Sequence, residues 1–351
     1  MEKKKLVLCT RLPEKRRKEI EQYCDITEAG ELLHGKGNVT EAQTREECRG
    51  YEIVVLGDEY AGADTLNDWA DNGMKFIGVA KGTPVTVDNK TIMGRGLQLS
   101  YTPGRNRVAV AEYCIGLMIA MARKITISAE GLRKGDHTSP VKENIYDVPD
   151  VKNVTFGPLD EKHPFTDYGI GFELYGKNLG IAGFGAIGRE VAKRAQAFGM
   201  NILAYDPFVP AEAIEATGAQ ACTLDEMLEN SDIVSIHLPV LDSTKGTVNR
   251  DWFSKMKKTA YLVNTARAAV IDQKDFVEAL QNKDIAGAAV DVYWEEPVPA
   301  NHPLLKMRNV VCTPHMAGLT TDVDNWSGEM MAQEVLAYLK GEPRKYIWKR
   351  V

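Results

Sequence analysis

The chain has 351 residues, of which 44% are hydrophobic and 26% charged, with a formal net charge of -6. This is the composition of a globular protein, and its length predicts two domains rather than a single core. The mildly acidic balance disfavours nucleic-acid or membrane-surface partners, because phosphate-rich surfaces attract basic patches.

The six cysteines are scattered and form no CxxC motif or metal-ligand cluster, so we expect free thiols and no metal. A basic start leads directly into the short apolar run Leu6–Cys9, which indicates a first strand rather than a signal peptide. A run of about 18 apolar residues, as a membrane-spanning helix needs, is not found. We expect a cytoplasmic protein.

Strand and helix patterns alternate in the first hundred residues. Pro13–Cys24 is charged and compatible with a helix. The apolar runs expected to form strands are Leu6–Cys9, Ile53–Leu56, Met74–Val79 and Leu97–Ser100. Such runs, separated by segments of helix length, predict a parallel sheet covered by helices.

Two contrasting segments follow. Val108–Lys124 is apolar on nearly all sides and contains no proline, which predicts a buried or interface helix. Residues of about 130–174 are rich in Gly, Pro, Asp and Asn and show little periodicity. A stretch of this length is unusual for a simple connection, and we expect it to be an arm across a dimer interface.

Regular alternation returns over residues 177–315. Six strands are expected there: Leu179–Ala182, Ile202–Tyr205, Ile233–Ile236, Ala260–Val263, Gly287–Val290 and Val310–Cys312. Their order fits a doubly wound nucleotide-binding domain. A final helix, Asp324–Lys340, is expected to pack back on the first domain, so that the second domain is inserted into the first.

A glycine motif opens this second domain. It reads Gly183-Phe-Gly185-Ala186-Ile187-Gly188, after an apolar strand and before a helix. The first glycine permits a tight turn, the second lets backbone approach a diphosphate, and the third lets helix and strand pack closely. The alternative is a glycine turn without a ligand, but the strand–turn–helix context favours dinucleotide binding.

Asp206 ends the next predicted strand, about 20 residues beyond the glycines. A carboxylate at this point accepts hydrogen bonds from the adenosine ribose and repels a 2′-phosphate. The sequence therefore predicts NAD rather than NADP.

Three further motifs follow strands of the same sheet and contain Arg267, Glu296 and His315. Ligands of doubly wound domains bind at the carboxyl ends of strands, so all three are expected near the cofactor. Singly, each has an ordinary explanation: a surface ion pair, a turn residue before proline and a loop histidine.

Their joint order resembles the D-isomer-specific 2-hydroxyacid dehydrogenase family, from about Met74 to Asp324. The resemblance implies two Rossmann-like domains, with the NAD-binding domain inserted into a flavodoxin-like substrate domain. We expect residues 1–103 and 318–351 to form the substrate domain and residues 104–317 the NAD domain. The sequence departs from the family pattern at Ala268, where glycine is usual, and in His315-Met-Ala-Gly318, where the family pattern is His-x-Gly-Gly.

The resemblance also implies roles. His315 would be the acid–base, Glu296 would orient it, and Arg267 would bind the substrate carboxylate. Lys81 and Gly82 match a substrate-carboxylate loop. The positions that match cofactor contacts are Val110, His237, Pro239, Thr265, Ala266 and Asp291.

The predicted function is therefore an NAD-dependent oxidoreductase that interconverts a D-2-hydroxy acid and its 2-keto acid, acting as a homodimer. Lys81, Arg105 and Arg107 favour a sugar-acid or phosphoglycerate-like substrate, unless they are simply solvated side chains. Two alternatives stay open: oxidation of formate or phosphite on the same fold, and an NAD-sensing, corepressor-like binding protein.

Overall fold

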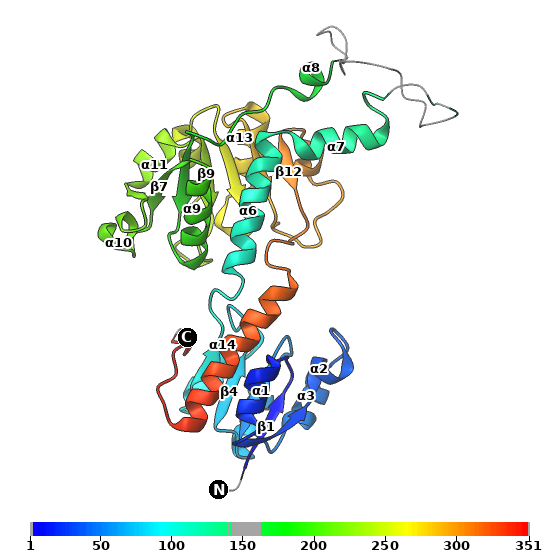
Figure 1. The fold of residues 1–351 in the computed structure, drawn as a ribbon, viewed down its shortest axis with the longest axis vertical. Coiled ribbons are helices and arrows are strands. Elements are labelled where there is room, and N and C mark those ends of the chain that lie inside the picture. Colours follow the sequence, from blue (N-terminus) through cyan, green and yellow to red (C-terminus); the bar gives the residue numbers. More distant parts are fainter. Residues whose placement is uncertain (1–2, 139–140, 142, 144–162, 350–351) are drawn as a thin grey trace. The chain divides into compact units, whose positions relative to one another are not determined.

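The computed structural model describes residues 3–138, 141, 143 and 163–349. The chain divides into two compact units, each built around one parallel sheet with helices packed against it (Figure 1). Unit 1 consists of Met1–Arg107 and Gly318–Val351, and unit 2 consists of Val108–Ala317. The protein is thus of the α/β class, as predicted. None of the described helices is both long and apolar enough to cross a bilayer.

Unit 1 has a five-stranded sheet in the order β2-β1-β3-β4-β5, the order of flavodoxin-like folds. Its strands are β1 (Lys4–Leu8), β2 (Cys24–Glu28), β3 (Ile53–Leu56), β4 (Phe76–Val79) and β5 (Leu99–Tyr101). Its helices are α1 (Glu14–Ile20), α2 (Gly30–His34), α3 (Glu41–Cys48), α4 (Ala63–Asp71), α5 (Asn89–Gly94) and α14 (Thr321–Lys340).

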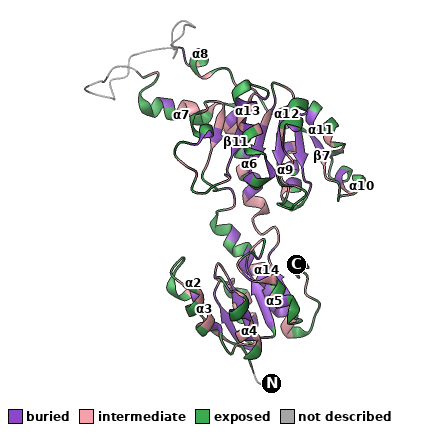
Figure 2. Ribbon diagram, turned by 180° about the vertical axis from the view of Figure 1, so that it is seen from behind, coloured by how far each residue is buried: buried purple, intermediate pink, exposed green. Residues whose placement is uncertain are grey.

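The central strands of this sheet are apolar throughout because both faces are covered. All four residues of β3 and of β4 are buried, and Figure 2 shows buried residues concentrated on the strands. β2 was not predicted, since its alternation of buried and exposed residues is that of an edge strand. It begins at Cys24, which we had expected to end a helical stretch.

The helix α14 returns to unit 1 from the far end of the chain. Thr320 caps its first turn by accepting a hydrogen bond from the Val323 N–H, and Gly341, with a φ of 67°, ends it. Met331 packs so closely on β4 that a Cβ at Gly78 would lie 2.5 Å from its sulfur. α14 therefore completes the core of a unit whose strands come from the first hundred residues.

Unit 2 has a seven-stranded sheet in the order β12-β11-β10-β9-β6-β7-β8. Its strands are β6 (Asn178–Ala182), β7 (Asn201–Tyr205), β8 (Gln220–Ala221), β9 (Ile233–Ile236), β10 (Tyr261–Asn264), β11 (Gly287–Val290) and β12 (Val310–Cys312). Six of them were predicted, and the seventh, β8, is a two-residue edge strand. The chain reverses direction across the sheet between β6 and β9, where doubly wound folds bind ligands.

The helices of unit 2 are α6 (Arg107–Ala122), α7 (Ile125–Lys134), α8 (Pro164–Tyr168), α9 (Ala186–Ala197), α10 (Ala211–Glu215), α11 (Leu224–Asn230), α12 (Arg250–Lys255) and α13 (Gln273–Asn282), with 3-10 turns η1 (Ala268–Val270) and η2 (Pro303–Lys306). The apolar helix α6 buries eight residues, as its composition predicted. It ends at Ala122 rather than Lys124, because Lys124 adopts a left-handed conformation with a φ of 58°.

The stretch expected to be irregular, about 130–174, contains the end of α7 and all of α8. Local chemistry explains α8: Pro164 occupies its first turn, and the His163 Nδ1 accepts a hydrogen bond from the Phe165 N–H. Most of the remaining stretch lies outside the described residues, and the predicted dimer arm with it.

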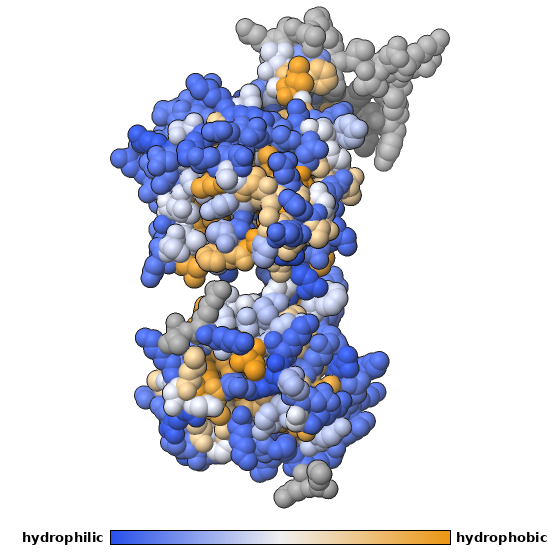
Figure 3. All heavy atoms as spheres, turned by 90° about the vertical axis from the view of Figure 1, so that its left-hand side faces the viewer, coloured by the Kyte–Doolittle hydropathy of each residue, from blue (hydrophilic) through white to orange (hydrophobic). Residues whose placement is uncertain are grey.

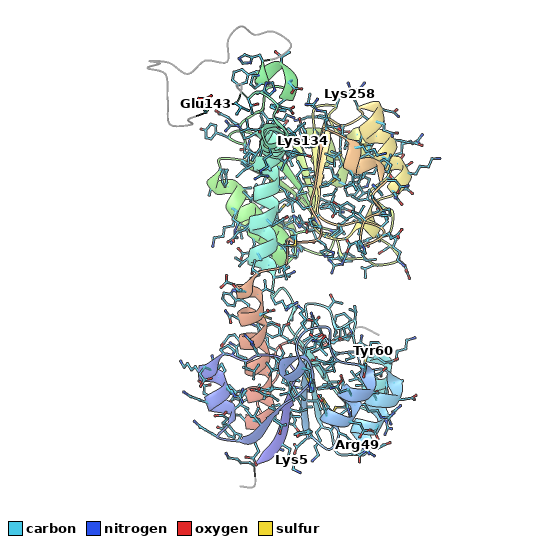
Figure 4. All side chains as sticks on the ribbon, turned by 90° about the vertical axis from the view of Figure 1, so that its right-hand side faces the viewer. Lys5, Arg49, Tyr60, Lys134, Glu143 and Lys258 are labelled. Carbon is cyan, nitrogen blue, oxygen red and sulfur yellow. The ribbon has the colours of Figure 1, made fainter. Side chains whose placement is uncertain are left out.

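Both units show a mainly polar face in one view (Figure 3). Hydrophilic residues cover most of the face drawn in Figure 3, and hydrophobic residues form smaller patches. Among the side chains drawn in Figure 4, Arg49 and Tyr60 belong to unit 1, and Lys134 and Lys258 belong to unit 2. Each of the four clusters of buried hydrophobic residues belongs wholly to one unit.

Candidate active site

The glycine turn joins β6 to α9 at the carboxyl end of the sheet. Gly183 has a φ of 94°, and a Cβ there would lie 2.7 Å from the His237 carbonyl oxygen. A Cβ at Gly188 would lie 2.3 Å from the Gly183 carbonyl oxygen, so this glycine permits helix and turn to pack. No atom lies within 4 Å of a Cβ built at Gly185, which leaves open space in front of the helix.

The first turn of α9 can therefore receive an anion. Gly185 is the N-cap, and it is exposed together with Ala186, whereas Ile187 is half-buried. The N–H groups of a helix's first turn have no acceptor within the helix, and they carry its positive dipole end. A diphosphate would satisfy these donors, and Gly185 gives it room.

Asp206 follows β7 and lies beside the glycine turn. Its Oδ2 accepts a hydrogen bond from the Phe184 N–H at 2.8 Å, and its Oδ1 accepts one from the Phe208 N–H at 2.9 Å. The carboxylate thus links two loops at the carboxyl edge of the sheet. Each oxygen retains a lone pair with which to accept a hydroxyl donor.

His237 and Pro239 follow β9, next to the point where the sheet order reverses. The His237 Nε2 lies 2.9 Å from the Ser235 Oγ, which lies 3.2 Å from the Cys114 Sγ on α6. Burial lowers the pKa of His237 to about 4, so its ring is neutral at physiological pH. Pro239 is exposed, and its carbonyl accepts a hydrogen bond from the Thr244 hydroxyl.

Two further predicted cofactor contacts, Val110 and Thr265, are buried. Val110 is buried on α6. The Thr265 hydroxyl is buried and lacks an oxygen or nitrogen partner among the described residues. The Cys114 thiol on α6 contacts this hydroxyl, but a thiol is a weak hydrogen-bonding partner, so the Thr265 hydroxyl keeps capacity to bind a polar group of a ligand.

Arg267 is exposed in the turn that follows β10. Asn264, at the end of that strand, is 1% exposed; its side chain donates to the Arg267 carbonyl at 3.1 Å and accepts from the Ala266 N–H at 3.0 Å. One guanidinium nitrogen of Arg267 donates to the Ala266 carbonyl at 2.7 Å. Asn264 therefore shapes the turn that presents Arg267, a role that the sequence around Arg267 did not reveal.

Glu296 and His315 form a hydrogen-bonded pair, with 2.6 Å between the Glu296 Oε2 and the His315 Nδ1. The Glu296 Oε1 accepts from the Tyr293 N–H at 2.9 Å, which fixes the carboxylate. Burial raises the pKa of Glu296. The hydrogen bonds from His315 and Tyr293 and the charge of Arg267 lower it by more than burial raises it, so the pKa lies below its ordinary value. The Nε2 of His315 has no partner among the described residues and is free to contact a ligand.

Asp291 anchors the loop that carries His315. This carboxylate is completely buried, and it accepts hydrogen bonds from the Thr313 hydroxyl at 2.6 Å, the Met316 N–H at 2.9 Å and the Ala317 N–H at 2.8 Å. His315 itself has a φ of 57°, uncommon for a non-glycine residue. The hydrogen bonds to residues on both sides of His315 hold this backbone in place, an effect that could not be predicted from the sequence.

Lys81 and Gly82 follow β4 in unit 1. Lys81 forms an ion pair with Asp58, which follows β3. Burial raises the pKa of Asp58, but the Lys81 and Lys36 ammonium groups lower it by more than burial raises it. The pKa is therefore depressed and the carboxylate is ionised. The carbonyl of Lys81 accepts a hydrogen bond from the Thr102 N–H at 2.9 Å, which ties this loop to the end of β5.

Unit 2 therefore combines two capabilities at one edge of its sheet. The glycine turn, Asp206 and the Thr265 hydroxyl are groups that suit a dinucleotide. The Glu296–His315 pair can hold and transfer a proton at the His315 Nε2, and the guanidinium donors of Arg267 can bind a carboxylate. The predicted contact Val110 lies on α6 and His237 directly follows β9, while Lys81 and Gly82 belong to the other unit.

Comparison with known proteins finds similarity to a dehydrogenase family model and to named reductases and dehydrogenases. A family model described as D-isomer specific 2-hydroxyacid dehydrogenase, NAD binding domain, matches residues 161–317. The glyoxylate reductase of Korarchaeum cryptofilum is 34% identical over 256 residues, which cover 73% of this chain and 70% of that protein. A crystal structure of a glyoxylate reductase from Paecilomyes thermophila has a TM-score of 0.74 at 25% identity, covering 99% of this chain and 98% of that chain.

The D-3-phosphoglycerate dehydrogenase of Methanocaldococcus jannaschii is 32% identical over 320 residues, or 90% of this chain. The chain spans about half the length of the phosphoglycerate dehydrogenases that it matches, 55% of this protein and 53% of the one from Archaeoglobus fulgidus. The relatives differ in the substrates that their names state, and the family model matches the unit that contains the glycine turn. The chain therefore belongs to the D-isomer specific 2-hydroxyacid dehydrogenase family.

Proposed function

We propose that this protein is an NAD-dependent oxidoreductase that interconverts a D-2-hydroxy acid and its 2-keto acid. The observation that carries the proposal is the 2.6 Å contact between Glu296 and His315, beside the charge of Arg267 and in the unit that contains the glycine turn. Unit 2 would bind the cofactor, and unit 1 would contribute substrate contacts through Lys81 and Gly82.

The chain's own residues would act on the substrate oxygen and carboxylate. When bound, the nicotinamide would supply a hydride for reduction or accept one for oxidation. His315 would donate a proton from its Nε2 to the forming alkoxide in reduction and take it back in oxidation. Glu296 would keep the ring oriented through Nδ1, and Arg267 would hold the substrate carboxylate and polarise the keto oxygen.

The remaining assignments concern specificity and assembly. Asp206 supports NAD, because its carboxylate would accept ribose hydroxyls and repel a 2′-phosphate. Asp291 would accept the nicotinamide amide in addition to holding the His315 loop. The apolar helix α6 supports a homodimer, and sugar-acid or phosphoglycerate-like acids are the favoured substrates.

A screen of NADH oxidation with a panel of 2-keto acids tests this function. We expect turnover by the wild type and, in His315→Ala, a kcat lower by about 100- to 10,000-fold with a similar Kd for NADH. His34→Ala is a matched control, because His34 also contacts a glutamate, Glu47, at 2.6 Å but lies in unit 1. Near-wild-type turnover by His315→Ala would contradict the mechanism, and NADH binding without turnover of any acid would indicate a binding protein instead.

A further inference from the structure

A second histidine of unit 2, His302, lies at the end of the loop that carries Glu296. This loop, residues 291–302, joins β11 to η2 and forms no helix or strand. His302 is 8% exposed, and its Nδ1 accepts a hydrogen bond from the Leu304 N–H at 3.3 Å, which caps η2. Burial lowers the pKa of His302, so its ring is neutral at physiological pH and can accept this bond.

The His302 ring also stacks on the indole of Trp294, near the start of the same loop. The ring centroids are 6.1 Å apart and the planes differ by 9°, which is an offset stack. Trp294 donates from its Nε1 to the Ile271 carbonyl at 3.0 Å, and the His302 Nε2 lies 3.0 Å from the side-chain amide of Gln273. Both rings are therefore anchored to the segment that directly follows the turn of Arg267 and η1.

The stack closes the loop around Glu296, because its two rings flank Glu296 in the chain. The Tyr293 N–H, next to Trp294, donates to the Glu296 Oε1 at 2.9 Å, and the Oε2 contacts the His315 Nδ1 at 2.6 Å. The Glu296 side chain is 36% exposed, so the surrounding protein encloses it only partly. A shift of Trp294 would move the Tyr293 N–H, and the carboxylate would move with it.

We propose that His302 is a positioning residue, which holds the 291–302 loop through its stack on Trp294 so that Glu296 meets His315. His302 itself would touch neither substrate nor cofactor. The inference rests on the proposed function, in which Glu296 orients the acid–base His315. A displacement of about 1 Å among reacting groups can lower a rate by about 100-fold, so a stack remote from the substrate can still control turnover.

The test measures kcat and the Kd for NADH, with the 2-keto acid that the wild type reduces fastest. His302→Asn keeps a side chain that can cap η2 but removes the ring, so we expect kcat to fall about 10- to 100-fold while Kd stays within about twofold. His302→Phe restores a ring and should keep kcat within about threefold of the wild type. Trp294→Leu removes the other ring and should lower kcat as His302→Asn does, which keeps the test available if His302→Asn does not fold.

A double-mutant cycle shows whether the effect passes through Glu296. In a Glu296→Ala background, the added His302→Asn should change kcat by less than about twofold, because the carboxylate that the stack positions is already absent. An equal loss with and without the Glu296 carboxylate would overturn the inference, since His302 would then act by another route.

His163→Asn is the matched control. His163 also precedes a proline in unit 2, and its Nδ1 also caps a short helix, by accepting from the Phe165 N–H at 3.2 Å. It lies outside the 291–302 loop, so its loss should leave kcat within about twofold of the wild type. Wild-type kcat in His302→Asn, folded as judged by circular dichroism, would overturn the inference alone. A wild type that binds NADH but reduces no 2-keto acid would overturn the proposed function with it.

Discussion

At Asp206, a single carboxylate has two roles that substitution can separate. Its charge would repel a 2′-phosphate, and its two oxygens accept the N–H groups of Phe184 and Phe208. We predict that Asp206→Asn, which removes the charge but keeps one acceptor, lowers the NADH-over-NADPH affinity ratio by about tenfold or more. Asp206→Ala should lower the ratio similarly and also reduce the free energy of unfolding by about 1 to 3 kcal/mol, because two N–H groups lose their acceptor.

Fluorescence titration with both cofactors and urea unfolding give the two readouts. Asp232→Asn is a suitable control. Asp232 also accepts a backbone N–H, that of Asn178, but it precedes β9 and so lies at the amino ends of the strands, away from the glycine turn. If both Asp206 variants kept the wild-type preference, the ribose would have to bind elsewhere.

Glu296 should make stability depend on pH in the acid range. Its pKa in the folded chain lies below the ordinary value of 4.5, because the contacts with His315 and Tyr293 outweigh burial. A depressed carboxyl pKa adds stability above the unfolded-state pKa, and this contribution is lost as the pH falls through the folded-state value. We predict that Glu296→Gln is less stable than the wild type near neutral pH, by less than about 1 kcal/mol for this partly exposed pair.

The difference should shrink below about pH 4.5. Urea unfolding of the wild type and of Glu296→Gln at a series of pH values measures this difference in stability. Glu295→Gln, the same substitution one residue earlier, is the control. A difference that stays constant with pH would attribute the effect of Glu296→Gln to packing rather than to charge.

Some features of the site could be predicted from the sequence and others could not. Arg267, Glu296 and His315 follow successive strands, and strand ends of a parallel sheet meet at one edge, so their common location could be predicted. The bonds from Asp291 to residues 313–317 could not, because their donors are mainly backbone N–H groups that any sequence would supply. The ion pair of Lys81 and Asp58 was likewise hidden, since its partners follow different strands of unit 1.

At the scale of elements, the turn between β6 and α9 offers two glycines with opposite surroundings. A Cβ at Gly188 would lie 2.3 Å from the Gly183 carbonyl oxygen, whereas no atom lies within 4 Å of one at Gly185. Gly185 also has a φ of -76°, which alanine adopts readily. We predict that Gly185→Ala melts like the wild type but binds NADH at least about tenfold more weakly, because its methyl group fills space needed by the diphosphate.

Gly188→Ala should instead lower the melting temperature of the protein without cofactor, because the methyl group pushes the helix away from the turn. Calorimetry and NADH titration distinguish the two effects. Wild-type affinity in a well-folded Gly185→Ala would show that the diphosphate does not approach this glycine.

The elements themselves were predictable to different degrees. Central strands such as β3 and β9 are continuous apolar runs, and their burial on both faces explains why the sequence revealed them. The edge strands β2 and β8 were missed, one because its residues alternate in burial and the other because it has two residues. α8 was missed because proline and histidine, typical loop residues, here begin a short helix.

For the whole molecule, the arrangement of the two cores has a thermodynamic consequence. Each unit has its own sheet and its own buried clusters, and unit 2 is a continuous stretch of chain between the two parts of unit 1. The proposed cofactor contacts all lie in unit 2. A ligand that binds only the folded state stabilises the structure that it contacts, by about 2.7 kcal/mol at a concentration of 100 times Kd.

We predict that NADH at that concentration slows hydrogen exchange about 100-fold in the slowest-exchanging amides of β6 and β9, and far less in those of β3 and β4. Mass spectrometry of peptides covering these strands measures both units in one sample. Gly185→Ala supplies the control, because binding that is tenfold weaker should reduce the slowing from about 100-fold to about 10-fold at the same NADH concentration. Equal slowing in both units would show that they unfold together, in which case the cofactor's binding energy stabilises the whole chain and not unit 2 alone.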